Sequence, residues 1–206
     1  MTVVSLKAEK PGSDGAVTVE FSDGSSLSVI TDYLNMGADP KTDYAGRELS
    51  GGEEEAFRFA AVCYRAEKTA LRLIARAEQS GLGLAAKLER RGFDAAVAKA
   101  VISRLLDRNL LDDGRYAELW IRSRLALRKA QSPQRLLAAL GKRGIGRTLS
   151  LKALEKVLDP EAEYALLLSY LSKTRFPESE KAFSLKAQLK REGFSSAVFD
   201  RYFDDC

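Results

Sequence analysis

One short phrase occurs three times in this chain at nearly equal spacing, and it constrains the fold more than any other feature. The copies are Leu88–Phe93, Leu140–Ile145 and Leu189–Phe194, and each has glycine as its fifth residue. The glycines lie at positions 92, 144 and 193, which are 52 and 49 residues apart. A period of this length is typical of a repeat array, in which each unit buries its apolar face against a neighbour. Such an array offers a long binding surface, so the pattern favours a protein that binds a partner.

Apolar residues recur at helical spacing from about residue 50 onward, so we expect helices there. A long first helix is predicted to begin after Ser50, a good N-cap, and to end near Ser80. Shorter helices are expected at 82–91, 94–107, 147–158 and 178–192, and after the caps Asp112 or Asp113, Ser132, Asp159 and Ser195. The repeat glycines fit left-handed helix C-caps, because none follows a strand or has the spacing of a phosphate-binding loop.

The first thirty residues follow a different period. Apolar and polar residues alternate from Val17 to Phe21 and again from Leu27 to Val29, which is the pattern of half-buried strands. The residues between them form a predicted turn, in which Gly24 can adopt a positive φ. With another short strand at Val3–Lys7, we predict a three-stranded antiparallel meander that packs against the first helices.

The predicted fold is therefore mainly α: a tandem array of three three-helix repeats, preceded by a small antiparallel β meander. We place the meander and a linker at residues 1–49 and the first repeat at 50–111. The second repeat is placed at 112–158 and the third at 159–206.

The composition excludes several classes of chemistry. The chain has 206 residues and no histidine, which removes the commonest general base and the commonest zinc ligand. Cys63 lies among apolar residues and is interpreted as a small buried side chain, remote from Cys206. No signal peptide or membrane-spanning stretch is visible, so the cytoplasm is expected. We expect no catalytic residue, no cofactor and no metal; the acids of Glu53–Glu55 suit a helix start better than acid–base catalysis.

The formal net charge of +4 conceals an uneven distribution. Residues 112–158 contain 11 bases and 4 acids, whereas residues 1–50 contain 4 bases and 8 acids. Between Glu118 and Glu155 there are nine bases and no acid. Such a block indicates a surface for a polyanion or for an acidic protein, although a solvated face without a partner is the alternative.

From about residue 49 to the C-terminus, the chain resembles the RecX family, regulatory proteins that modulate the RecA recombinase. The resemblance rests on Leu84, Leu88, Arg91-Gly92-Phe93-Asp94, Leu105, Leu110-Leu111-Asp112-Asp113-x-Arg115-Tyr116-Ala117, Arg122-Ser123-Arg124 and Leu140-x-x-Arg143-Gly144-Ile145. The combination is specific, whereas each piece alone is weak. One departure is that Arg128–Pro133 lacks the glycine-rich basic turn that is common before the second helix of the middle unit.

The resemblance implies an elongated, curved array of three-helix modules that acts without chemistry of its own. It implies binding to the RecA–DNA filament and limitation of the filament's ATPase, strand-exchange and co-protease activities in recombination and DNA repair. The expected partners are this filament and, weakly, single- or double-stranded DNA, for a protein that is a monomer and binds no membrane. The candidate contact residues are Arg91, Arg115, Arg122, Arg124, Arg128, Lys129, Arg135, Lys142, Arg143 and Arg147.

Several alternatives stay open at the level of sequence. Arg91 and Arg143 precede repeat glycines, where a base near a helix C-terminus is equally explained by the helix dipole. Tyr116 and Trp120 are interpreted as core residues rather than stacking platforms, because they lie four apart on one helix face. The alternative function is a direct DNA-binding module that uses the basic central repeat without sequence-specific readout.

Overall fold

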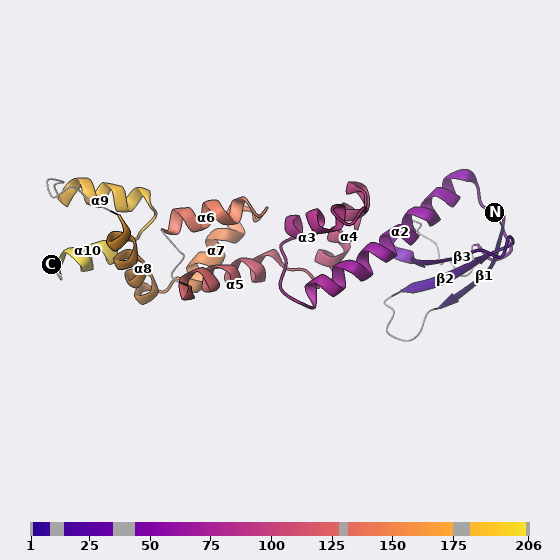
Figure 1. Cartoon of the computed structure of the whole chain (residues 1–206), viewed down its shortest axis with the longest axis horizontal. Coiled ribbons are helices and arrows are strands. Elements are labelled where there is room, and N and C mark those ends of the chain that lie inside the picture. The colour runs from indigo at the N-terminus through magenta and orange to yellow at the C-terminus, as the bar shows by residue number, and fades with distance from the viewer. Residues whose placement is uncertain (1, 9–14, 35–43, 128–131, 175–181, 205–206) are drawn as a thin grey trace. The chain divides into compact units, whose positions relative to one another are not determined.

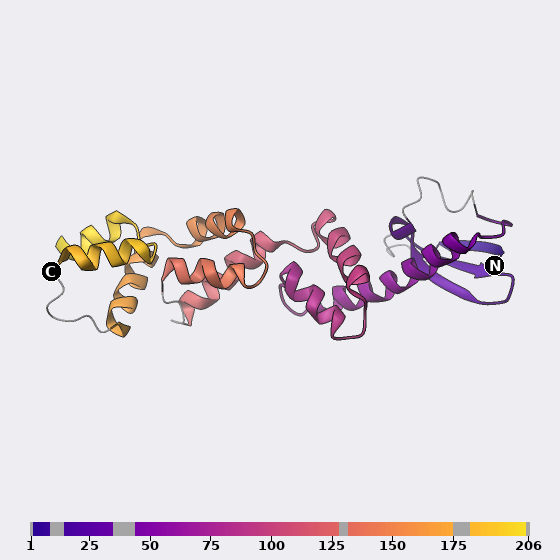
Figure 2. The same ribbon diagram turned by 90° about the horizontal axis from the view of Figure 1, so that it is seen from above.

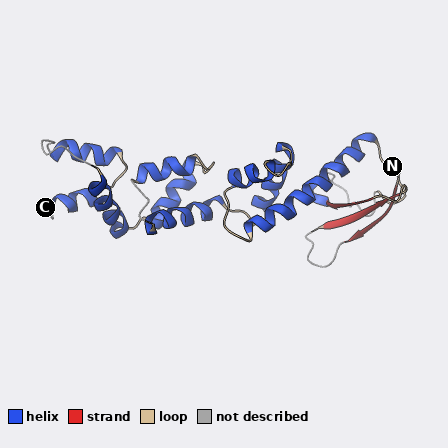
Figure 3. Cartoon of the chain, in the orientation of Figure 1, coloured by secondary structure: helices blue, strands red, loops and turns tan. Residues whose placement is uncertain are grey.

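The computed structural model describes residues 2–8, 15–34, 44–127, 132–174 and 182–204. The chain divides into two compact units. The first contains Met1–Glu78 and Leu84–Leu111, and the second contains Gln79–Gly83 and Asp112–Cys206. Figure 3 shows strands only in the N-terminal part of the chain, followed by helices.

Three strands form one antiparallel sheet in the order β1 (Val3–Ala8), β2 (Ala16–Phe21) and β3 (Ser26–Ile30). The β2–β3 register pairs Ala16 with Ile30 and Glu20 with Ser26. The turn between these strands contains Gly24 at a φ of 80°, a left-handed conformation that glycine adopts without steric cost. The predicted meander is therefore confirmed.

The described residues after the sheet form one 3-10 helix, η1 (Thr31–Leu34), and nine α-helices. These are α2 (Gly51–Ile74), α3 (Gly81–Glu89), α4 (Ala95–Asp107), α5 (Asp113–Ala126), α6 (Pro133–Gly141), α7 (Arg147–Val157), α8 (Pro160–Lys173), α9 (Ala182–Arg191) and α10 (Ser196–Asp204). The predicted mainly helical fold is confirmed. The start of the helix expected at 178–192 lies outside the described residues, and the four-part division of the chain stays a prediction.

The sheet and the helices of the first unit share one hydrophobic core. In Figures 1 and 2, α2 lies beside the sheet, and its residues contact β3, η1 and α4. Phe57 of α2 is fully buried and meets the rings of Phe21 and Tyr44 edge-on, with centroids 6.4 and 5.4 Å away. The meander thus packs against the first helix, as its small size required.

A buried polar network joins three elements of this unit. Arg104 of α4 donates from Nη1 to Oε1 of Glu67 on α2 at 2.5 Å, and both side chains are more than 90% buried. The Arg104 Nε donates to Asp32 of η1 at 2.9 Å, and the hydroxyl of Tyr33 donates to Glu67. The buried charges are therefore mutually compensated, which is the condition for placing them in an apolar core.

The long first helix ends earlier than predicted. It stops at Ile74 rather than near Ser80, and the amides of Arg76 and Ala77 both return to the carbonyl of Leu73. Ser80 instead begins the next helix, because its Oγ accepts from the amide of Gly83 at 3.1 Å. The sequence prediction was wrong here because Ser80 was interpreted as a stop signal, whereas it acts as an N-terminal cap.

The second unit has its own core. Helix α7 packs on α5 and α6, and α10 packs on α8 and α9. Ile121, Leu140, Leu167 and Leu189 are fully buried between these helices. The side chains of the predicted caps Asp112, Ser132 and Asp159 accept from the amides of Arg115, Arg135 and Ala162. Of the helices in the described residues, none is long and apolar enough to cross a membrane.

Candidate functional site

The three repeat glycines form turns of the same shape in different surroundings. Gly92, Gly144 and Gly193 have φ values of 86°, 82° and 85°, which confirms the left-handed C-caps. A Cβ added to Gly144 would lie 2.6 Å from the Cβ of Leu82, and one on Gly193 would lie 3.2 Å from the amide nitrogen of Gln134. A Cβ on Gly92 would meet nothing within 4 Å. The second and third turns therefore also pack closely against another segment of the chain, whereas the first does not.

The residue before each glycine has a structural task. Arg91 donates from Nη1 to the carbonyl of Lys87 at 2.9 Å, and Arg143 donates to the carbonyl of Ala139 at 2.7 Å. Each guanidinium therefore satisfies a carbonyl in the last turn of its own helix, as the helix-end interpretation predicts. The third copy has Glu192, whose carboxylate accepts from the hydroxyl of Ser132 at 2.5 Å. The third copy has an acid where the first two have an arginine, because this turn packs against the start of α6 and its carboxylate binds Ser132 there.

Trp120 holds two guanidinium groups. The Cζ atoms of Arg124 and Arg143 lie 4.9 and 4.5 Å from the centroid of its ring, within cation–π distance. Tyr116 and Trp120 are half-buried and pack against the core of the second unit, as the core interpretation predicts, but the ring of Trp120 also serves as a stacking surface for the two guanidinium groups. The sequence missed the stacking of Arg143, because this residue comes from a different helix. Arg124 follows Trp120 by four residues, so its contact could have been anticipated from helical spacing.

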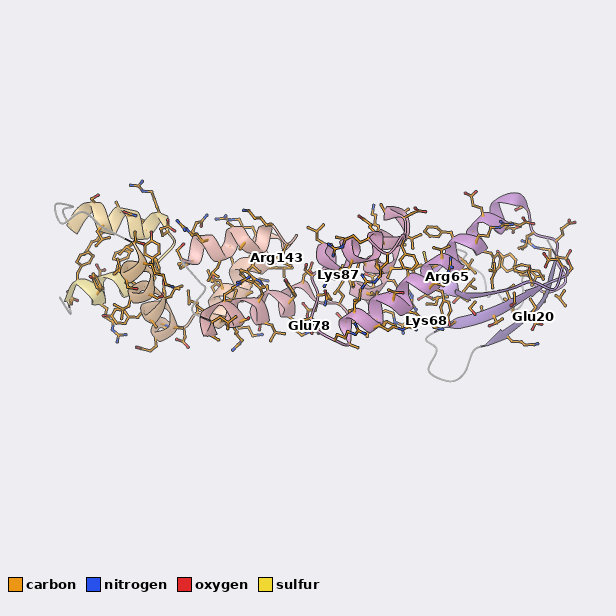
Figure 4. The ribbon with its side chains drawn as sticks, in the orientation of Figure 1. Glu20, Arg65, Lys68, Glu78, Lys87 and Arg143 are labelled. Carbon is orange, nitrogen blue, oxygen red and sulfur yellow. The ribbon has the colours of Figure 1, made fainter. Side chains whose placement is uncertain are left out.

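Four bases gather around α6, and we call them the α6 basic surface: Arg124, Arg135, Lys142 and Arg143. Arg135 and Lys142 are exposed and seven residues apart, which places them on the same side of α6. Arg143 follows Lys142 directly, and its guanidinium and that of Arg124 both lie over the ring of Trp120. Figure 4 labels Arg143 on this part of the second unit. The surface combines two exposed bases with two that are held against an aromatic ring.

The α6 basic surface has few acidic neighbours among the described residues. Within that part of the chain no ion pair involves Lys142, and the carboxylate of Glu192 lies 3.8 Å from the Nε of Arg135. The local positive charge is therefore only partly compensated, and it can attract an anionic partner.

The other candidate bases that the structure describes lie on other elements or on the other side of α5. Arg115 and Arg122 lie on one side of α5, about 200° around the helix from Arg124 at 100° per residue. Arg147 is exposed at the start of α7, and Arg91 belongs to the first unit. Arg128 and Lys129 lie outside the described residues. The structure thus brings together four of the eight candidate bases that it describes.

These features define a class of protein: a helical repeat protein with a basic surface built on one of its three-helix units. Within the described residues, no group of three or more histidine, cysteine, aspartate or glutamate side chains is placed to hold a metal ion.

Comparison with known proteins identifies the family. The profile of the first three-helix domain of RecX matches residues 66–105, and that of the second matches residues 112–154. The regulatory protein RecX of Treponema pallidum (strain Nichols) is 36% identical over 143 residues, which are 69% of this chain and 86% of that protein. RecX of Halorhodospira halophila is 34% identical over 152 residues, or 71% of this chain and 86% of that protein.

Two solved structures share the fold. A crystal structure of regulatory protein RecX superposes with a TM-score of 0.63 at 20% identity and covers 98% of both chains. RecX from Lactobacillus salivarius gives a TM-score of 0.52 at 20% identity, over 70% of this chain and 96% of the other. The chain belongs to the RecX family of regulatory proteins.

Proposed function

We propose that this protein is a non-enzymatic modulator of the RecA recombinase. It binds the RecA–DNA filament and limits its ATPase, strand-exchange and co-protease activities in recombination and DNA repair. The observation that carries the proposal is the α6 basic surface on a three-helix repeat of the RecX family. The DNA of the filament carries phosphate groups, which attract this positive charge.

Part of the α6 basic surface is organised before any partner binds. The guanidinium of Arg143 is held by the Ala139 carbonyl and by the ring of Trp120, so little side-chain entropy remains to be lost there. Lys142 is exposed and can adapt to a partner. The fixed guanidinium of Arg143 can set the position of a bound polyanion, and the exposed Lys142 can adjust to its nearest phosphate or carboxylate.

A modulator without chemistry acts by preferring one state of its partner. It can lower ATP hydrolysis only if it binds the less active form of the filament more tightly than the active form. The protein is therefore expected to act in proportion to its occupancy on the filament, and without turnover. Mixing it with RecA on single-stranded DNA at rising ratios, and following ATP hydrolysis, tests this directly. No change in hydrolysis or in filament stability at any ratio would refute the proposal.

A second candidate function is direct, non-sequence-specific DNA binding through the α6 basic surface. The exposed Lys142, together with Arg124 and Arg143 beside Trp120, favours it. Contacts of this kind weaken steeply as salt rises, because they release counterions from DNA. Tight DNA binding in high salt without RecA would favour DNA as the primary partner. Binding to DNA only at low salt would favour the filament.

A further inference from the structure

We propose that the exposed face of α2 is a second binding site, which takes the phosphate backbone of a single-stranded nucleic acid. This site lies in the first unit and does not include the α6 basic surface. It rests on the second candidate function, direct binding of nucleic acid, and assigns a separate site for it. We call it the α2 arginine line and define it by four residues: Arg58, Arg65, Arg72 and Arg76.

The spacing of the α2 arginine line follows from helical geometry. Arg58, Arg65 and Arg72 are seven residues apart, so each lies two turns further along α2, with a drift of only about 20°. Their Cα atoms are about 10 Å apart along the helix axis, at a rise of about 1.5 Å per residue. Arg76 lies just beyond the end of the helix. Figure 4 labels Arg65 on α2.

Arg58 has an acidic neighbour, because Glu54 lies one turn before it on α2 and lines the same pocket, whereas Arg65 and Arg72 have no exposed acid within a turn on α2. All four arginines are exposed, and none forms an ion pair with a described residue. From residue 56 to residue 77 the only acid is Glu67, which is 3% exposed and bound to Arg104. The solvent-facing side of α2 therefore carries no exposed acid from Arg65 to Arg76. A set of unpaired guanidinium groups in a row is suited to a linear polyanion.

The side chains between the arginines argue against a protein partner. Val62 and Thr69 lie on the same face of α2 and are short and half-buried. Protein interfaces depend on large apolar or aromatic anchors in their centre. The nearest exposed apolar side chain of α2 is Leu71, which lies about 100° around the helix from Arg72. The α2 arginine line thus presents positive charge without a large apolar side chain at its centre, which is typical of contacts to a phosphate backbone.

The straightness of α2 favours a single strand over a duplex. Arg58 and Arg72 are about 21 Å apart along the helix axis. A duplex turns once in about 34–36 Å, so one strand would pass to the far side within this distance. A flexible single strand can follow the helix and meet every arginine. The expected ligand is therefore single-stranded DNA or RNA, bound through phosphate and without base recognition.

The test is the salt dependence of binding to a fluorescently labelled oligothymidylate, measured by anisotropy without RecA. The variant Arg58→Gln/Arg65→Gln/Arg72→Gln keeps good helix formers and removes three charges. Each phosphate contact contributes about 0.7 to the slope of log K against log salt for single strands, so a slope smaller by about 2 is expected. The control Lys99→Gln/Lys190→Gln/Arg191→Gln removes three exposed charges elsewhere, and its slope should match that of the unmodified protein.

An unchanged salt slope in the α2 variant would overturn this inference, and so would an equal loss of slope in the control variant. If the α2 variant binds the oligonucleotide normally but no longer binds a RecA filament, the line is a protein contact and the inference is wrong. Unfolding midpoints of both variants should equal that of the unmodified protein, because the substituted side chains are exposed. If the α2 variant unfolds early, Arg65→Gln alone is used, with an expected slope change of about 0.7.

Discussion

At the scale of single residues, Glu67 and Arg104 hold together elements that are distant in the sequence. Each charge is tolerated in the core because the other compensates it. We predict that Arg104→Met alone costs about 3–5 kcal/mol of the free energy of unfolding, because it leaves the Glu67 carboxylate buried and unpaired. The double variant Glu67→Leu/Arg104→Met should cost much less. Urea unfolding of the unmodified protein, Arg104→Met, Glu67→Leu and the double variant measures the difference, and additive losses would contradict this coupling.

Cys63 provides a pH-dependent prediction. Burial, with a smaller contribution from the charge of Glu67, raises the pKa of the Cys63 thiol to about 12. In the unfolded chain the thiol ionises near its ordinary pKa of about 8.5. Above pH 9 the unfolded state therefore binds fewer protons than the folded state, and the free energy of unfolding falls as pH rises. In a Cys206→Ala background, Cys63→Ala should reduce this slope between pH 9 and pH 11; identical slopes would contradict the assignment.

At the scale of elements, the glycine turns explain why one phrase occurs three times. A turn in the left-handed region is needed in every copy, but only the second and third copies also pack closely against another segment. The phrase was recognisable in the sequence because the left-handed turn requires glycine. Its packing was not, because Leu82 and Gly144 are 62 residues apart.

The two kinds of glycine turn predict different losses of stability when their glycines are replaced by alanine. Gly92→Ala should cost about 1–2 kcal/mol, the strain of placing a Cβ in the left-handed region. Gly144→Ala should cost a further 1–3 kcal/mol or so, because its Cβ collides with Leu82. Leu82→Gly removes the colliding Cβ, so combining it with Gly144→Ala should recover most of the additional loss. Chemical denaturation measures the free energies of unfolding, and the prediction is wrong if Gly92→Ala and Gly144→Ala are equally stable.

The N-terminal ends of several helices could be predicted from the sequence, because their caps depend only on neighbouring residues. Asp112, Ser132 and Asp159 were predicted as caps and act as caps, because a side-chain oxygen needs only an amide three residues away. Asp94 occupies the predicted cap position, but its side chain makes no capping hydrogen bond. The end of α2 was predicted wrongly, because Ser80 caps the start of α3 instead of closing α2, and the adjacent amide of Gly81 is bound by Asp113, a residue distant in the sequence. Local patterns cannot reveal such a contact.

The candidate site was only partly predictable for a similar reason. The excess of bases in the second repeat is visible in the composition, but the side of the helix that each base occupies depends on packing. Arg122 and Arg124 are neighbours in the sequence and lie on opposite sides of α5. The α2 arginine line was missed because acids at the start of α2 and the buried Glu67 mask it in a simple charge count.

At the scale of the whole molecule, the N-terminal sheet belongs to the first compact unit. Deleting residues 1–49 would expose Phe57 and other core residues, at roughly 1.5–3 kcal/mol for each large side chain. We predict faster hydrogen exchange in residues 51–107 of the shortened chain and little change in residues 113–173. Unchanged protection throughout would show that the sheet adds nothing to this core.

We propose that the α6 basic surface binds the RecA filament. The most direct measurement is the rate of filament disassembly on single-stranded DNA, with increasing amounts of three proteins. These are the unmodified chain, Arg124→Gln/Lys142→Glu, and the matched control Arg191→Gln/Lys190→Glu, whose exposed bases lie in α9. We predict that the unmodified chain and the control accelerate disassembly equally, and that the α6 variant needs at least tenfold more protein, or about 1.4 kcal/mol of binding free energy. Equal action of all three proteins, or no action by any of them, would contradict the claim.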